Sequence, residues 1–229
     1  MNSEEKLRKN KLNNLEKNPF QINKFFRNTN AREIIEQFAD YSREELEIKN
    51  KKVIVAGRII KIREFKRSIF ANLTDQENTI QLMISENKEF KEIDVGDIIG
   101  VEGTVTKSQK GELSIKLNKF SLLSKCLKPL PDAYYGFDDI EERFRKRYLD
   151  FIINSEKRKI FLIRHKIIQN IRKFFDDREF IEIETPILVA EASGAQAKPF
   201  ITHHNKLHRD YSLRIALEIF LKTLVIGGF

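Results

Sequence analysis

Between residues 51 and 123 apolar and polar side chains alternate, and this pattern limits the possible folds more than any other feature of the chain. Alternation with a period of two is typical of strands that bury one face. The first run starts at Lys51, with Val53 and Val55 on the same side. Turn residues separate it from four more predicted strands, at residues 68–73, 79–84, 98–107 and 113–122.

Five strands in about 70 residues predict a small Greek-key barrel of the OB type, whose exposed face commonly binds single-stranded nucleic acid. An SH3-like barrel of the same size is the alternative. Helical patterns flank the barrel on both sides, so the fold class that we expect for the whole chain is α+β.

Helices are predicted before the barrel. Residues 4–17 form a basic segment with a narrow apolar stripe, and a helix there should end before Pro19. Asn30 with Glu33, and Ser42 with Glu45, have the spacing of N-terminal helix caps. Two short helices that pack against the barrel are therefore expected.

A long helix is predicted after the barrel, over residues 156–176, because apolar residues recur there every three or four positions. We expect this helix to bury a broad apolar face. Residues 181–185 then alternate as in a strand, which Pro186 should end. The neighbouring pair Asp176 and Asp177 is typical of a solvated turn.

Pro129 and Pro131 indicate a linker between the two parts. The expected domains are a helical extension over residues 1–50, a barrel over 51–127, a linker and hinge over 128–150, and the start of a second domain over 151–229.

The chain carries 42 Lys and Arg against 34 Asp and Glu, a net charge of +8. Such an excess suits a polyanionic partner such as RNA, although a solvated lysine-rich surface has the same composition. The single cysteine, Cys126, excludes an intramolecular disulfide and favours a reducing compartment. No apolar run is long enough to cross a bilayer, so we expect a cytoplasmic protein without a membrane partner.

Three histidines, at positions 203, 204 and 208, do not predict a metal site. No cysteine accompanies them, and adjacent strand residues point to opposite faces. The chain also has no glycine-rich phosphate loop of the P-loop or dinucleotide type.

Several segments, in this order, resemble the lysyl-tRNA synthetases of class II. Residues 53–59 (VIVAGRI), 111–115 (GELSI), 120–125 (FSLLSK) and 128–132 (KPLPD) are similar to that family's barrel and linker. Residues 139–150 (DIEERFRKRYLD) and 198–205 (KPFITHHN) are similar to its hinge and early catalytic segments, and residues 175–188 resemble class II motif 1. The aspartyl and asparaginyl synthetases share the barrel and motif 1 but fit residues 198–205 poorly.

The resemblance implies a lysine–tRNA ligase, which activates lysine with ATP and Mg²⁺ and transfers it to tRNA-Lys. Motifs 2 and 3 of class II do not occur in the 229 residues. We therefore expect an incomplete form that contains none of the catalytic residues and is inactive alone. The alternative function is that of a non-catalytic OB module that binds tRNA or single-stranded nucleic acid.

The resemblance also assigns site residues. Phe70 would stack on an anticodon uridine, Gln81 would bind a base edge, and Arg58 and Glu112 would add contacts. The strand pattern alone allows Phe70 to be an ordinary core residue instead.

For the lysine substrate, the resemblance points to the carbonyl of Gly194 and the carboxylate of Glu218, next to Leu217 where many members have proline. Without the family, Glu218 would be an ordinary solvated helix residue. Phe180 and Pro186, in motif 1, would lie at a homodimer interface.

Overall fold

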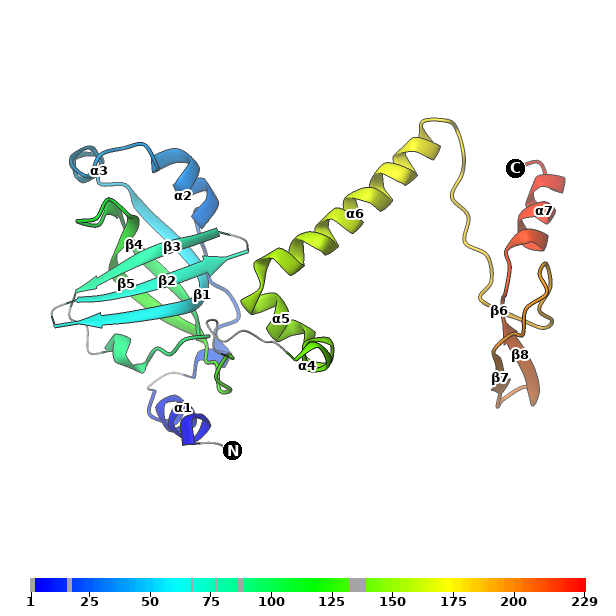
Figure 1. Cartoon of the computed structure of the whole chain (residues 1–229), viewed down its shortest axis with the longest axis horizontal. Helices are drawn as coiled ribbons and strands as arrows, with labels where there is room; N and C mark the ends of the chain where they lie inside the picture. The colour runs from blue at the N-terminus through cyan, green and yellow to red at the C-terminus, as the bar shows by residue number, and fades with distance from the viewer. Residues whose placement is uncertain (1–2, 16–17, 67, 77, 86–88, 132–138) are drawn as a thin grey trace. The chain divides into compact units, whose positions relative to one another are not determined.

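The computed structural model describes residues 3–15, 18–66, 68–76, 78–85, 89–131 and 139–229 (Figure 1). The chain divides into two compact units, Met1–Arg158 and Lys159–Phe229. The helices of the first unit are α1 (Ser3–Asn13), η1 (Pro19–Gln21), α2 (Ala31–Phe38), α3 (Arg43–Lys49), η2 (Glu89–Glu92), α4 (Ile140–Arg145) and α5 (Arg147–Ile153).

The first unit is built on a closed five-stranded barrel with the strand order β1-β2-β3-β5-β4. Its strands are β1 (Lys52–Phe65), β2 (Ser68–Asp75), β3 (Asn78–Ser85), β4 (Ile98–Lys107) and β5 (Leu113–Ser124). All neighbouring strands pair antiparallel except β3 and β5, which are parallel. The five expected strands and the OB-type barrel are confirmed.

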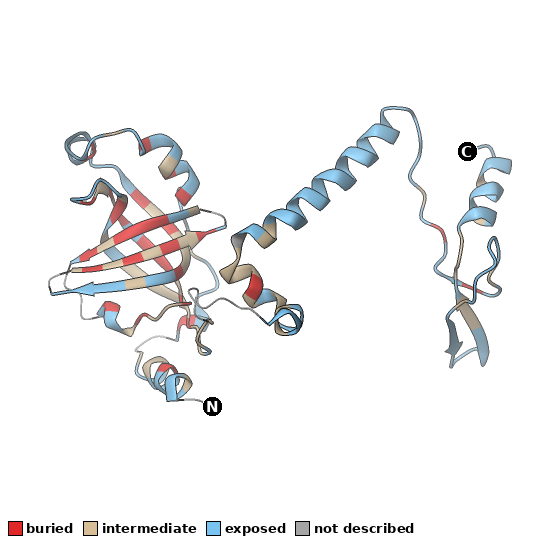
Figure 2. Ribbon diagram, in the orientation of Figure 1, coloured by how far each residue is buried: buried red, intermediate tan, exposed pale blue. Residues whose placement is uncertain are grey.

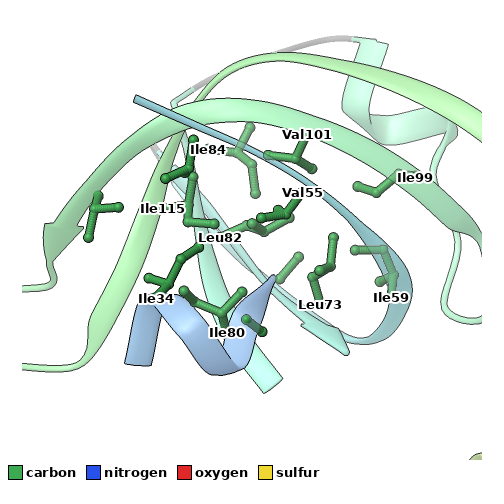
Figure 3. Packing of buried hydrophobic residues seen from close by; sticks show 14 of the residues in the cluster. Ile34, Val55, Ile59, Leu73, Ile80, Leu82, Ile84, Ile99, Val101 and Ile115 are labelled. Atoms are coloured by element: carbon green, nitrogen blue, oxygen red, sulfur yellow. The ribbon is translucent and has the colours of Figure 1, made fainter. Parts of the chain in front are cut away.

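Alternate residues of the five strands fill the barrel interior (Figure 3). Helix α2 adds Ile34 to this core, where it lies beside Ile80 and Leu82. The expected cap of α2 is present, because the Asn30 side chain accepts a hydrogen bond from the Glu33 N–H at 2.9 Å. Ser42 and Glu45 form the expected capping box at the start of α3. Both helices are thus fixed where the sequence predicted them.

Helix α1 differs from its prediction in both length and attachment. It ends at Asn13 rather than near residue 17, and Leu7 of the expected apolar stripe is 56% exposed. Arg8 is buried instead, and its Nη1 donates to the carbonyl oxygens of Val95 and Cys126, each at 2.9 Å. Polar contacts therefore hold α1 on the barrel.

A buried ion cluster lies beneath α1. The Lys125 side chain is fully buried, and its Nζ lies 2.6 Å from an Asp94 carboxylate oxygen and 2.7 Å from one of Asp97. Lys11 of α1 contacts the other oxygen of Asp94 at 2.8 Å. Burial raises the pKa of Asp94, but the hydrogen bonds from Lys11 and Lys125 outweigh it, so the pKa lies below its usual value.

The second unit contains most of α6 (Ser155–Asp176), a small sheet and α7 (Glu218–Ile226). The sheet has the order β6-β8-β7, from β6 (Leu188–Val189), β7 (Ile201–His204) and β8 (Arg209–Leu213). Helix α6 agrees with the predicted span. Its expected buried face is wrong for this chain, because every α6 residue from Lys159 onward is exposed (Figure 2).

The strand expected over residues 181–185 is also wrong. These residues have no regular secondary structure, and β6 begins only after Pro186. A strand needs a neighbour for its ladder of hydrogen bonds, and no β-partner lies beside this segment in the described part of the chain. Arg214 donates to the Thr185 carbonyl and hydroxyl oxygens instead.

The expected domain bounds stay a prediction, and residues 132–138 of the predicted linker lie outside the described residues. Within the described residues, no helix has both the length and the apolar character that crossing a membrane requires.

Candidate nucleic-acid interface

The strand register places Phe70 in a row of side chains on the outside of the barrel. Ile69 and Ala71 point inward and are buried, so Phe70 points outward. Partners in register share a face of the sheet. Arg63 on β1, Met83 on β3 and Lys116 on β5 therefore continue the row of Phe70.

A second outward row contains Gln81. Asn72 of β2 opposes both Lys61 of β1 and Gln81 of β3, and Gln81 pairs with Ser114 of β5. Phe70 and Gln81 thus lie on the same outer surface, on adjacent strands and in neighbouring rows. Diagonal neighbours of this kind are within reach of one ligand.

Phe70 is half-buried, with its ring outside the apolar core. The Phe70 ring packs edge to face against the Phe65 ring, with the two centroids 5.6 Å apart. A hollow of about 380 Å³ adjoins Phe70 and is also lined by Arg43, Met83, Lys116 and Asn118. An aromatic ring beside cationic and amide side chains suits the stacking of an unpaired base.

Gln81 is held in a polar network with Glu112 and Ser114. Its Nε2 donates to Glu112 Oε2 at 2.6 Å, and its Oε1 accepts from Ser114 Oγ at 3.0 Å. These contacts fix the orientation of the amide, which keeps a second N–H and a second lone pair for a base edge. Gln81 is only 5% exposed, whereas Glu112 is exposed at the turn before β5. A base would reach Gln81 by displacing Glu112.

Arg58 stands apart from the other predicted residues. It opposes Thr74, four positions along β2 from Phe70, and its Nη1 donates to the Gly96 carbonyl oxygen at 2.6 Å. The structure therefore brings Phe70, Gln81 and Glu112 together but not Arg58.

Sequence reasoning missed three cations of this face, Lys61, Arg63 and Lys116. Residues 58–63 continue the apolar and polar pattern of the first strand, but the pairing of β1 with β2 shifts between Ile59 and Lys61. An irregularity of this kind decides which side chains lie beside Phe70, and one strand's pattern does not show it.

Gly194 and Glu218, the predicted lysine contacts, lie side by side in the second unit. Gly194 has a φ of +89°, and a Cβ there would lie 3.1 Å from the Ala216 Cβ and 3.4 Å from the Glu218 Cβ. Glu218 is exposed at the start of α7, and its Oε1 accepts from Lys222 Nζ at 2.6 Å. A glycine carbonyl and a carboxylate at one place suit an ammonium group.

The remaining predicted residues are exposed. Phe180 is 62% exposed, with its ring 5.4 Å from that of Phe175, and Pro186 is exposed after the irregular segment. His203 Nδ1 lies 2.7 Å from Asp210 Oδ1. Over the described residues, no three or more His, Cys, Asp and Glu side chains gather as metal ligands.

Two known families match the two parts of the chain. Residues 53–123 match the OB-fold nucleic acid binding domain, and residues 139–229 match the class II tRNA synthetases of the D, K and N group. The first match coincides with the barrel that carries Phe70 and Gln81.

Relatives match over the full length of the chain. A protein from Mycoplasma capricolum named "Lysine--tRNA ligase" is 45% identical over 238 residues, which cover 99% of this chain and 48% of that protein. A protein of the same name from Bacillus cereus is 43% identical over 239 residues, covering 100% and 48%. The chain thus spans about half the length of the curated relatives it matches.

Proposed function

Because this chain belongs to the class II lysyl-tRNA synthetases, we propose that it forms part of a lysine–tRNA ligase and that its barrel binds the anticodon. The observation that carries the proposal is the outward position of Phe70 beside the Gln81 network. The ligase activates lysine with ATP and transfers it to tRNA-Lys. Since such an enzyme works where its tRNA is found, we place this function in the cytoplasm.

The barrel face offers two kinds of recognition. The Phe70 ring supplies a stacking plane, which is typically worth about 1–3 kcal/mol per base. Gln81 supplies a base-edge hydrogen bond once the base displaces Glu112, and Ser114 holds the other end of the amide. Lys61, Arg63 and Lys116 supply positive charge beside them for the RNA backbone.

The second unit supplies a binding point for the lysine substrate. We assign the α-ammonium group to the Glu218 carboxylate and the Gly194 carbonyl, because the two residues are adjacent. A bound substrate would replace Lys222 as the partner of Glu218. A side chain at position 194 would crowd this contact and require a strained positive φ.

ATP and Mg²⁺ belong to the proposed reaction of the whole enzyme. The described residues contain no cluster of carboxylate or imidazole groups that would hold a metal ion.

A second copy of the chain is the proposed partner of α6. Its apolar residues Ile163, Ile167, Ile171 and Phe174 are each at least 50% exposed, and they recur along one helix face. Phe180 and the unpaired segment before Pro186 extend this surface. A homodimer formed through α6 and these residues would cover apolar side chains that the chain itself leaves exposed.

The proposal is tested with anticodon stem-loops that differ at one base. The chain with Gln81→Ala should lose discrimination between uridine and cytidine at one loop position, while its affinity for the cytidine stem-loop stays the same. Thr79→Ala, on the same strand, is the matched control. If the wild-type chain binds both stem-loops equally, it is a general single-strand binder, the alternative function, and the anticodon assignment is wrong.

A further inference from the structure

A hollow of about 390 Å³ in the first unit is lined by three arginines, Arg27, Arg58 and Arg158. They come from three separate segments: the stretch before α2, strand β1 and the first turns of α6. Ile98 and Phe151 add apolar walls. Separate segments of the fold thus bring like charges together around one space.

No carboxylate in the described part of the chain pairs with these guanidinium groups. Over the described residues, Arg27 and Arg158 have no ion pair, and Arg158 Nε is buried without a hydrogen-bond partner. Arg58 uses one N–H on the Gly96 carbonyl, which carries no formal charge. The lining contains one carboxylate, Asp75, and its Oδ2 already accepts from the Ala31 N–H at 2.8 Å.

A buried donor without a partner, such as Arg158 Nε, is costly, and cationic side chains around one hollow favour an anion there. Guanidinium groups match the oxygens of phosphate through paired hydrogen bonds. Thr74 joins the hollow to the outward face, about 13 Å along β2 from Phe70. An RNA strand on that face would therefore extend toward the three arginines.

We propose that Arg27, Arg58 and Arg158 form a binding site for a backbone phosphate of the RNA bound to the barrel. The site rests on the proposed RNA-binding function but adds a contact that no base-reading residue supplies. It contributes affinity and register, and it does not discriminate between bases.

The test measures the affinity of the chain for the uridine stem-loop at salt concentrations from about 50 to 200 mM. Over this range the affinity falls according to the number of phosphate contacts, because each contact releases counterions. Arg27→Gln and Arg158→Gln are compared with Arg32→Gln, which removes the same charge from an exposed residue paired with Glu36. Each test variant should flatten the slope of log affinity against log salt by about 0.7–0.9, with unchanged discrimination between uridine and cytidine. Arg27 is exposed, so its variant tests the site even if replacement of Arg158 disturbs folding.

Slopes equal to that of the Arg32→Gln control in both variants would overturn the phosphate site. A flattened slope with altered base discrimination would also overturn it, because the arginines would then contact bases. Absence of any wild-type binding would instead count against the proposed function itself.

Discussion

At the scale of single residues, the sequence placed Phe70 and Gln81 on adjacent strands but left Phe70 as either core or surface. The register resolves this, since Ile69 and Ala71 take the inward positions on either side. The Gln81 contact with Glu112 was not predictable, because it depends on how the turn after β4 folds back onto β3. The buried ion cluster was missed as well, since lysine and aspartate in a turn usually indicate solvent.

Lys125 is expected to be essential for stability although it takes no part in the candidate interface. Lys125→Met removes the cation between Asp94 and Asp97, which leaves the buried Asp97 carboxylate without a cationic partner and leaves Asp94 with Lys11 alone. The loss should be about 3–5 kcal/mol of unfolding free energy, measured by denaturant titration. Lys119→Met, an exposed lysine on β5, should change stability by less than about 0.5 kcal/mol. Equal stability of the two variants would show that the cluster contributes nothing.

Asp94 predicts a loss of stability in acid. Its pKa is lower in the folded chain than in the unfolded chain, so the unfolded chain binds a proton first as the pH falls. The contribution of Asp94 is therefore complete above its pKa in the unfolded chain and disappears as the pH drops through the lower pKa of the folded chain. Asp94→Asn should lower the free energy of unfolding at pH 7 and make its fall with decreasing pH less steep. A variant with as steep a fall as the wild type would contradict the assignment.

At the scale of secondary-structure elements, the sequence predicts closely those whose stabilising contacts are local or lie within the barrel. The span of α6 followed from its period alone, because a helix satisfies its own backbone hydrogen bonds. The segment 181–185 has an equally regular pattern but forms no strand, because a strand depends on a neighbour. The apolar face of α6 and this segment both have the sequence pattern of a buried element, and the described part of the chain does not cover either of them.

The α6 face yields a test of self-association. Ile167→Glu places a carboxylate in the proposed dimer interface and should raise the dimer dissociation constant more than about tenfold, since an unpaired buried charge is costly. Lys166→Glu changes a neighbouring exposed position and serves as the control. Light scattering across a concentration series gives the mass of each. A wild-type chain that is monomeric at every concentration, or a dimer that Ile167→Glu leaves intact, would reject α6 as the interface.

At the scale of the whole molecule, the chain combines an OB-fold barrel, for which we propose RNA binding, with a separate unit that carries the proposed lysine contacts. The prolines and the change of pattern predict a boundary at residues 128–150, whereas the two compact units meet at Arg158 and Lys159. We propose the bounds 51–127 for the barrel and 128–150 for the linker and hinge. Limited proteolysis should then cut first near residues 128–137, and earlier cutting inside residues 53–122 would reject these bounds.

The role of Phe70 in RNA binding is tested most directly by one paired measurement on Phe70→Ala. Thermal unfolding and affinity for the uridine stem-loop are measured on the same protein. An outward stacking residue predicts a binding loss of about 1–3 kcal/mol with a nearly unchanged melting temperature. A core residue predicts about 3–5 kcal/mol of lost stability, and a strongly destabilised variant whose folded fraction still binds normally would contradict the anticodon role of the barrel face.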